Sequence, residues 1–292
     1  MGYIEHLLII ICIYIILAVS LNLIMGFTGL LNLGHAAFFG IGAYTSALLT
    51  LAGVPFGIAF IASFVVAGMF GFLIGLPCLR LRGDYLAIAT LGFGEIIRAV
   101  LKNWISLTRG PLGIPGIPKA SFFITFDTSV KFLVFAAVIA VVTIGIVSRL
   151  VHSPFGRVLK SIREDEIAAQ ALGKNVMKYK MIALVIGAAF AGIAGSMYAH
   201  YITFIDPSSF TLVETILIVS MVVLGGLGSL LGSVIGVIIL VLLPEPLRFV
   251  QLPSAIVAAI RQMLYAIILI VLMIVRPQGM VGEKRYKARV EE

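Results

Sequence analysis

The sequence predicts an all-α polytopic membrane protein with about eight to ten transmembrane helices. Hydrophobic residues make up 61% of the 292 residues and charged residues only 12%, and the mean hydropathy is +1.16. Uncharged apolar runs such as residues 7–21 recur along the chain, without the period-two alternation of membrane β-strands. Because lipid cannot satisfy backbone N–H and C=O groups, helices are the spanning structure that such runs form.

Each run of about 20 residues rises about 1.5 Å per residue and so crosses a hydrocarbon core of about 30 Å. Two glycine-rich stretches, residues 26–42 and 225–236, could instead hold broken or re-entrant helices, and their similar glycine rhythm suggests a distant internal repeat. The whole chain, residues 1–292, is then a single transmembrane domain. We expect spans over residues 4–25, 30–50, 56–79, 84–101, 130–149, 179–200, 209–227, 229–243 and 256–275.

Small residues recur four positions apart inside several spans, which predicts close helix packing where no hydrophobic effect drives association. The pairs are Gly71 and Gly75, Ala188 and Gly192, Ala191 and Gly195, and Gly232 and Gly236. Cys12 and Cys78 lie inside apolar runs, and we expect buried thiols there rather than a disulfide. The first apolar run lacks a basic flank and a cleavage site, so we expect a retained helix rather than a signal peptide.

Lys and Arg between the spans predict the orientation, because cytoplasmic loops are enriched in both. These residues concentrate in residues 149–180, in the short loop with Arg80 and Arg82, and in the tail, residues 276–292. We therefore assign these segments, the C-terminus included, to the cytoplasm. The net charge of +8 lies between the spans, which argues against nucleic acid as a partner and for membrane lipid as the solvent.

The polar loop at residues 152–178 is the best functional clue. Ser153 suits a helix N-cap and Pro154 a first helical position, while Glu164, Asp165 and Glu166 favour the start of a second helix. A simple connector would need neither helix, so we expect an element that docks a cytoplasmic protein; helices lying on the membrane surface are the alternative. Its candidate residues are Ser153, Pro154, Gly156, Arg157, Arg163, Glu164, Asp165, Glu166, Ala168, Ala169 and Gly173.

The second of these helices has a predicted apolar stripe, and Gly173 is a natural residue to follow its end. The stripe consists of Ile167, Ala168, Ala171 and Leu172.

Polar residues inside the spans are candidates for the lining of a solute path, although interhelical hydrogen bonding explains each one alone. Glu95 and Arg98 lie three positions apart on one helical face, which predicts a structural ion pair near the outer interface, with a role in the path as the alternative. His35 has no companion ligands, so we expect no metal site. The candidates are Asn22, Asn32, His35, Tyr44, Thr45 and Glu95.

Several longer segments resemble the LivM family, the permease subunits of branched-chain amino acid ABC importers. They occur in the family's order, cover essentially the whole chain, and are residues 21–26, 34–44, 82–96, 113–118, 153–173, 223–229 and 276–279. The Ala168-Ala169-x-x-x-Gly173 pattern resembles the coupling loop of such permeases, but Ile167 stands where a Glu is expected and Glu166 is one place early. A sister permease subunit of such importers is similar at residues 225–229 and 276–279. Residues 82–96 and the long outer loop with its glycines and prolines favour the LivM-type subunit over this sister.

The resemblance implies a type II-like importer permease in the inner membrane. It implies as partners a second permease subunit, distinct or identical, two cytoplasmic ATPase subunits and a periplasmic or lipid-anchored solute-binding protein, for which residues 102–129 offer a receiving surface or merely a connector. It implies branched-chain or other hydrophobic amino acids as the solute, with urea or short amides as the alternative.

The chain has no Gly-x-x-x-x-Gly-Lys-[Ser/Thr] phosphate loop. ATP and Mg²⁺ would therefore be used by the partner ATPases, and we expect this chain to bind no cofactor and to be no enzyme. An ion-coupled secondary transporter is the alternative from a different class, and it predicts ionisable residues near mid-membrane, of which the sequence offers few. A purely structural membrane scaffold is a further alternative, but it does not explain the two helices expected at residues 153–173.

Overall fold

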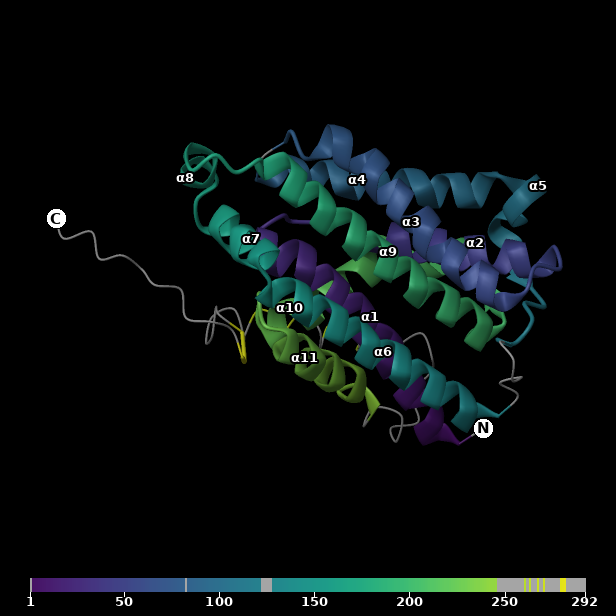
Figure 1. The fold of residues 1–292 in the computed structure, drawn as a ribbon. Coiled ribbons are helices and arrows are strands. Elements are labelled where there is room, and N and C mark those ends of the chain that lie inside the picture. Colours follow the sequence, from purple (N-terminus) through teal and green to yellow (C-terminus); the bar gives the residue numbers. More distant parts are fainter. Residues whose placement is uncertain are drawn as a thin grey trace.

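The computed structural model describes residues 2–81, 83–121, 128–245 and 279–281, with single positions at 260, 263, 267 and 270. Arg82, most of the predicted span at 256–275 and most of the tail at 276–292 lie outside the described residues. The described part is a bundle of helices with one short β-ladder (Figure 1). This confirms the all-α fold class.

The helices follow the predicted spans closely along the first half of the chain. The elements are α1 (Tyr3–Thr28), α2 (His35–Leu51), α3 (Phe56–Cys78), α4 (Asp84–Asn103), α5 (Ile105–Thr108), η1 (Gly110–Leu112), β1 (Ile114–Pro115), α6 (Ser129–His152), α7 (Pro154–Glu164), α8 (Glu166–Ala171), α9 (Val176–Ile202), β2 (Phe204–Ile205), η2 (Pro207–Ser209), α10 (Leu212–Gly225) and α11 (Leu230–Leu242).

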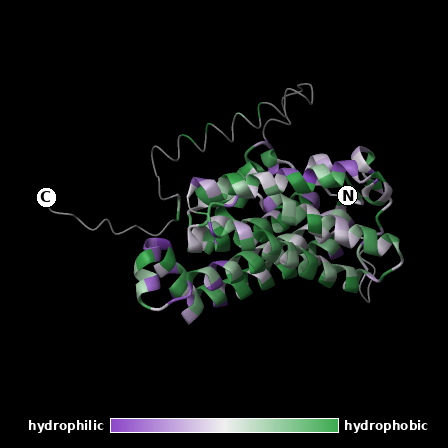
Figure 2. Ribbon diagram, turned by 90° about the horizontal axis from the view of Figure 1, so that it is seen from above, coloured by the Kyte–Doolittle hydropathy of each residue, from purple (hydrophilic) through white to green (hydrophobic). Residues whose placement is uncertain are grey.

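Helices α1 and α9 form the centre of the bundle. Every residue of α1 from position 15 to position 28 is buried, as expected of a helix that is hydrophobic all round. Helix α6, by contrast, exposes apolar residues such as Val134, Val138 and Val142 on one side, which is the face that lipid would cover. Figure 2 shows hydrophobic residues along the whole bundle and strongly hydrophilic residues at the end of the bundle where α8 projects.

Five described segments are long and apolar enough to cross a membrane, so the chain is a multi-pass membrane protein. They are Tyr3–Thr28, Phe56–Cys78, Ser129–His152, Val176–Ile202 and Pro207–Gly225.

Small residues bring the central helices together as predicted. A Cβ on Gly71 would lie 2.7 Å from the Cβ of Ala188, and a Cβ on Gly192 would lie 2.5 Å from the carbonyl oxygen of Ser63. At Gly195 the backbone of α2 approaches even more closely, because a Cβ there would be 2.1 Å from the carbonyl oxygen of Phe39. These glycines therefore set the spacing between α9 and its neighbours.

Both glycine-rich stretches interrupt helices, which confirms that prediction. The first break, residues 29–34, separates α1 from α2, and the second, residues 226–229, separates α10 from α11. Helix α11 has 13 residues, so it is about 20 Å long and too short to cross a core of about 30 Å. The spans predicted at 30–50 and 229–243 are therefore shorter than expected. The internal repeat stays a prediction.

The end of the bundle opposite α8 is closed by a short two-stranded β-ladder, and we call this end the ladder end. Ile114 of β1 pairs with Ile205 of β2 in an antiparallel ladder. A buried hydrogen-bonded group lies beneath it: His200 contacts the carbonyl oxygen of Pro118 through Nδ1 at 2.7 Å and Ser46 Oγ through Nε2 at 2.9 Å. The loop after α4 is thus fastened to the end of α9.

We expect Gly195→Val to destabilise the protein by about 1–3 kcal/mol, because the new side chain would overlap the α2 backbone. Thermal unfolding of the detergent-purified protein, followed by size-exclusion chromatography, measures the effect. Gly145→Val on α6 is the matched control, since no atom of residues 2–81, 83–121 or 128–245 lies within 4 Å of a Cβ at that position. Equal melting temperatures for the two variants would contradict this account of the packing.

Candidate functional site

The α7–α8 element, Pro154–Ala171, follows directly from the end of α6. Gly156 permits the sharp turn, because a Cβ there would lie 1.9 Å from the carbonyl oxygen of Val151. Ser153 stands at the predicted N-cap position, but its hydroxyl donates back to the carbonyl oxygen of Leu150 at 2.6 Å. Leu159 and Ile162 are buried beneath α7, and Arg157 is exposed on the outside.

Helix α8 forms as predicted. Asp165 is its N-cap, and its Oδ1 accepts hydrogen bonds from the backbone N–H groups of Ile167 at 2.8 Å and Ala168 at 3.0 Å. Gly173 follows the helix with a φ of +75°, the left-handed conformation that favours glycine at this position. Glu166 of α8 forms a 2.7 Å ion pair with Lys180 of α9, which fixes the helix to the bundle.

The apolar stripe of α8 does not face the bundle. Ala169 is the residue that packs inward, against Ile162 and Val176. Ile167 is 70% exposed and Leu172 is 77% exposed, so the two largest members of the predicted stripe project away from the protein. The α7–α8 element therefore presents two exposed apolar side chains among polar neighbours, since Glu164, Asp165 and Gln170 are exposed as well.

Arg163 connects this element to the first helix break. Its Nη1 donates a hydrogen bond to the carbonyl oxygen of Gly26, one of the last carbonyls of α1, which carry the negative end of the helix dipole. Its aliphatic part lies over Gly29, where a Cβ would be 3.5 Å from Cγ of Arg163. One turn earlier, Lys160 Nζ stands 5.9 Å from the ring centre of Phe27. Two cations of α7 thus cap the end of α1.

The second helix break contacts the last turns of α1 at the same place. Asn22 Oδ1 accepts a hydrogen bond from the backbone N–H of Gly228 at 2.9 Å, and Asn22 Nδ2 donates to the Ser229 carbonyl oxygen at 2.9 Å. A Cβ on Gly26 would lie 2.5 Å from the Gly228 nitrogen, and Gly228 also lies against Arg163 Nη1. We call these five residues the junction: Asn22, Gly26, Arg163, Gly228 and Ser229.

The remaining candidates for a path lining are distributed over several places. His35 is fully buried and contacts Ser20 Oγ through Nε2 at 3.0 Å, whereas its Nδ1 has no partner among the described residues. The hydroxyl of Tyr44 is also buried, and no described residue bonds to it. Thr45 is half-buried, and Glu95 pairs with Arg98 at 2.6 Å, as predicted. A role of these residues in a solute path stays a prediction.

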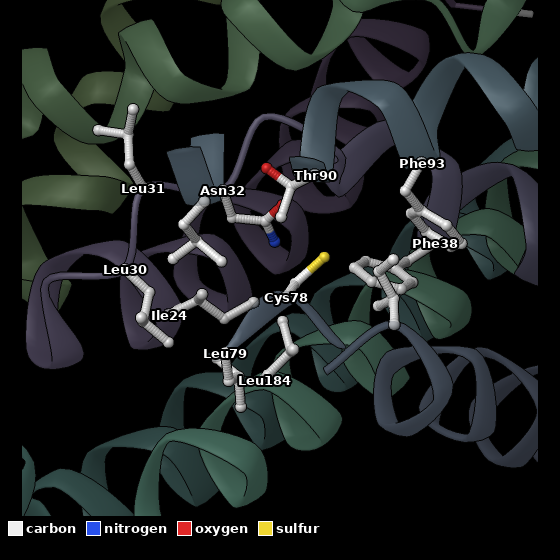
Figure 3. Close-up of a pocket in the computed structure, with 12 residues that line it drawn as sticks. Ile24, Leu30, Leu31, Asn32, Phe38, Cys78, Leu79, Thr90, Phe93 and Leu184 are labelled. Atoms are coloured by element: carbon white, nitrogen blue, oxygen red, sulfur yellow. The ribbon is translucent and has the colours of Figure 1, made fainter. Parts of the chain in front are cut away.

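Asn32 lies in the first break and borders an apolar pocket of about 320 Å³, its open mouth included (Figure 3). Its Oδ1 accepts a hydrogen bond from Gly34 N at 2.9 Å, and its buried Nδ2 has no partner in the part of the chain that the structure describes. Thr90 is the other polar lining residue and accepts a hydrogen bond from Leu33 N at 3.0 Å. The other walls are Ile24, Leu30, Leu31, Phe38, Ile74, Cys78, Leu79, Leu86, Phe93 and Leu184.

Sequence reasoning missed the partners in these contacts. Nothing local indicates that Arg163 reaches Gly26, or that Tyr14 donates a hydrogen bond to Glu214 at 2.5 Å. The available signal was the presence of an amide or a charge inside an apolar run, which predicts that a partner exists without saying which one.

Comparison with known families identifies the chain's relatives. The family described as the branched-chain amino acid transport system permease component matches residues 3–275. The chain belongs to this family. The high-affinity branched-chain amino acid transport system permease protein LivM of Escherichia coli is 38% identical over 96% of this chain and 70% of its own length. A probable LivM of Methanocaldococcus jannaschii is 28% identical over 93% of this chain and 91% of its own length.

A second permease type is more distant. The permease protein LivH of Escherichia coli is 26% identical over 92% of this chain and 91% of its own length. The resemblance to LivM predicted from the sequence is confirmed, and no solved structure matches the chain.

We expect Asn22→Ala to lower the free energy of unfolding by about 1–3 kcal/mol, because the buried N–H of Gly228 would lose its acceptor. Thermal unfolding in detergent measures the loss. Asn103→Ala, at the exposed end of α4, removes a hydrogen bond to the Ala99 carbonyl oxygen and serves as control. If Asn22→Ala and Asn103→Ala had the same melting temperature, the hydrogen bonds of Asn22 would contribute no more to stability than a surface contact does.

Proposed function

We propose that this chain is the LivM-type permease subunit of an ATP-driven importer of branched-chain amino acids in the inner membrane. Family membership supports the transport class, and the names of the relatives support the solute. The observation that carries the coupling to ATP is the α7–α8 element, which presents two uncovered apolar side chains on its outside and contacts both helix breaks through Arg163.

The α7–α8 end of the bundle faces the cytoplasm, and the ladder end faces the outside. The basic residues of the loop at 149–180 support this orientation, since such residues are retained on the cytoplasmic side. The C-terminus then also lies in the cytoplasm. A periplasmic or lipid-anchored solute-binding protein would deliver the amino acid at the ladder end.

Two cytoplasmic ATPase subunits and a second permease complete the transporter. The relatives LivM and LivH carry the name of one transport system, which favours a distinct second permease over a second copy of this chain. Ile167 and Leu172 would enter a groove of one ATPase, as apolar anchors surrounded by polar residues do in protein interfaces. ATP and Mg²⁺ stay with the ATPases, and this chain holds no cofactor and catalyses no reaction.

The contacts of Arg163 suggest how ATP hydrolysis would move the solute path. A displacement of α8 passes through the Glu166–Lys180 pair to α9 and through Arg163 to the end of α1 and the α10–α11 break. Helix breaks can change direction at little cost, because their backbone groups are already bonded to partners outside the helix ladder. The junction would thus convert motion of the element into opening and closing of the path.

The double variant Ile167→Ala, Leu172→Ala should reduce ATP-driven leucine uptake about tenfold or more, because it removes both apolar anchors of the ATPase contact. Uptake of radiolabelled leucine into vesicles containing the whole transporter measures this, with copurification of the ATPases as a second readout. Gln170→Ala, exposed on the same helix, is the control.

Two results would contradict the proposal. One is normal uptake and ATPase binding by the double variant. The other is leucine accumulation by this chain alone in vesicles with an ion gradient and no ATP, which would identify a secondary transporter.

Arg163→Ala should separate ATP hydrolysis from transport. The ATPases would still bind through α8 and hydrolyse ATP, but leucine uptake per ATP hydrolysed should fall about tenfold, since the junction loses its contact with α7. Both rates are measured on the same proteoliposomes. Arg149→Ala, an exposed arginine in the last turn of α6, is the charge-matched control. An unchanged ratio of uptake to hydrolysis in Arg163→Ala would remove Arg163 from the coupling route.

A further inference from the structure

Helix α4 lies at the margin of the bundle and leaves one side uncovered by any described residue (Figure 1). Its buried residues are Leu86, Ala87, Thr90 and Leu101. The opposite side, which we call the α4 face, follows helical spacing and includes three strongly exposed residues, Tyr85, Ile88 and Ile96. The full α4 face consists of Tyr85, Ile88, Gly92, Glu95, Ile96 and Ala99.

This face carries an ion pair near the middle of the helix. Glu95 lies 11 residues into the 20-residue helix, and thus about 17 Å from its start at about 1.5 Å per residue. The predicted pair is therefore present, and its depth in the membrane stays a prediction. The Glu95 side chain is 41% exposed and that of Arg98 is 38% exposed.

Lipid is a poor cover for such a face. Charged side chains at mid-membrane are costly and almost always face protein or a water-filled cavity. Helix α4 is long enough to span, yet it is not among the five described segments that are apolar enough for lipid. The exposed valines of α6, Val134, Val138 and Val142, show the uncharged surface that lipid accepts.

The α4 face also has room for a close neighbour. No atom of a described residue lies within 4 Å of a Cβ built on Gly92, in the middle of the α4 face, and a glycine there lets another helix approach closely. Beside it, Glu95 and Gly94 line a shallow hollow together with Thr211 and Thr215, so the open surface continues from α4 to the start of α10.

We propose that the second permease subunit packs on the α4 face, with its closest approach at Gly92 and with the Glu95–Arg98 pair at the polar boundary of the solute path between the two permeases. The inference rests on the proposed function for the existence of that partner. Only a membrane-embedded partner reaches this surface, because the ATPases and the solute-binding protein contact the bundle from its two ends.

Photo-crosslinking in membranes that contain the whole transporter tests the surface. A benzophenone amino acid replaces Ile88 or Ile96 on α4, and Val134 or Val138 on α6 as controls. We expect crosslinks to the second permease from the two α4 positions and crosslinks to lipid from the two α6 positions. Crosslinks from α4 to lipid, to this chain itself or to a second copy of it would overturn the proposal, as would equal yields from α6.

A matched pair of glycine variants provides the second test. Gly92→Trp should abolish copurification of the second permease and reduce leucine uptake to background, while Gly145→Trp on α6 should leave both at the wild-type level. Both sites are open, so each variant should retain the wild-type melting temperature in the isolated chain. Retained copurification and uptake in Gly92→Trp would refute the inference.

The two proposals fail in different ways. If the wild-type transporter showed no ATP-driven leucine uptake, the proposed function would fail. If wild-type uptake were normal and the α4 positions gave no crosslink to the second permease, only the assignment of this surface would fail.

Discussion

A helix end buried in a bundle leaves backbone groups that need partners outside the helix, and the arrangement of this protein follows from how it meets that constraint. The chain breaks its helices at residues 29–34 and 226–229 and brings the last turns of α1 into contact with the second break. Asn22 supplies an amide that both donates to and accepts from the second break, and Arg163 supplies a cation to the end of α1. Glycine at positions 26 and 228 is what allows the two backbones to touch.

The hydrogen bond from Arg163 to the end of α1 also connects the interior of the bundle with the exposed α7–α8 element. Because the cation that caps α1 comes from α7, the polar element cannot shift without disturbing a helix end deep in the fold. The exposed side chains of α8 and the capped end of α1 are therefore parts of one mechanical unit, with the Glu166–Lys180 pair as a second attachment. In the proposed importer this unit receives the motion of the ATPases, and the α4 face bounds the path that the motion opens.

Local sequence patterns predicted much of this architecture. Runs of apolar residues located the spans, glycine clusters located the breaks, and Ser153, Asp165 and Gly173 marked the limits of α7 and α8 within a residue. These features depend on the local backbone conformation and on whether a segment prefers lipid or water, and the residues of a short segment are enough to predict both.

Features that depend on distant neighbours were not predictable in this way. The stripe of α8 was assigned correctly as apolar, but which of its residues face the bundle depends on Ile162 and Val176 of neighbouring helices. The hydrogen bonds of Asn22 and the contact of Arg163 with Gly26 join segments far apart in the chain. The periodicity of a helix predicts which of its faces is buried, but not which element packs against that face. The position of Glu95 along α4 likewise depends on where that helix begins and ends.

The central claim is that the α7–α8 element and the two helix breaks move as one body. Pulsed electron paramagnetic resonance between spin labels at Ser161 on α7 and Leu231 at the start of α11, both exposed, tests it in the whole transporter with and without ATP and vanadate. The account predicts an unchanged distance for this pair and a changed distance between Ser161 and Leu112 at the ladder end. A changed distance between Ser161 and Leu231, with the other constant, would contradict it.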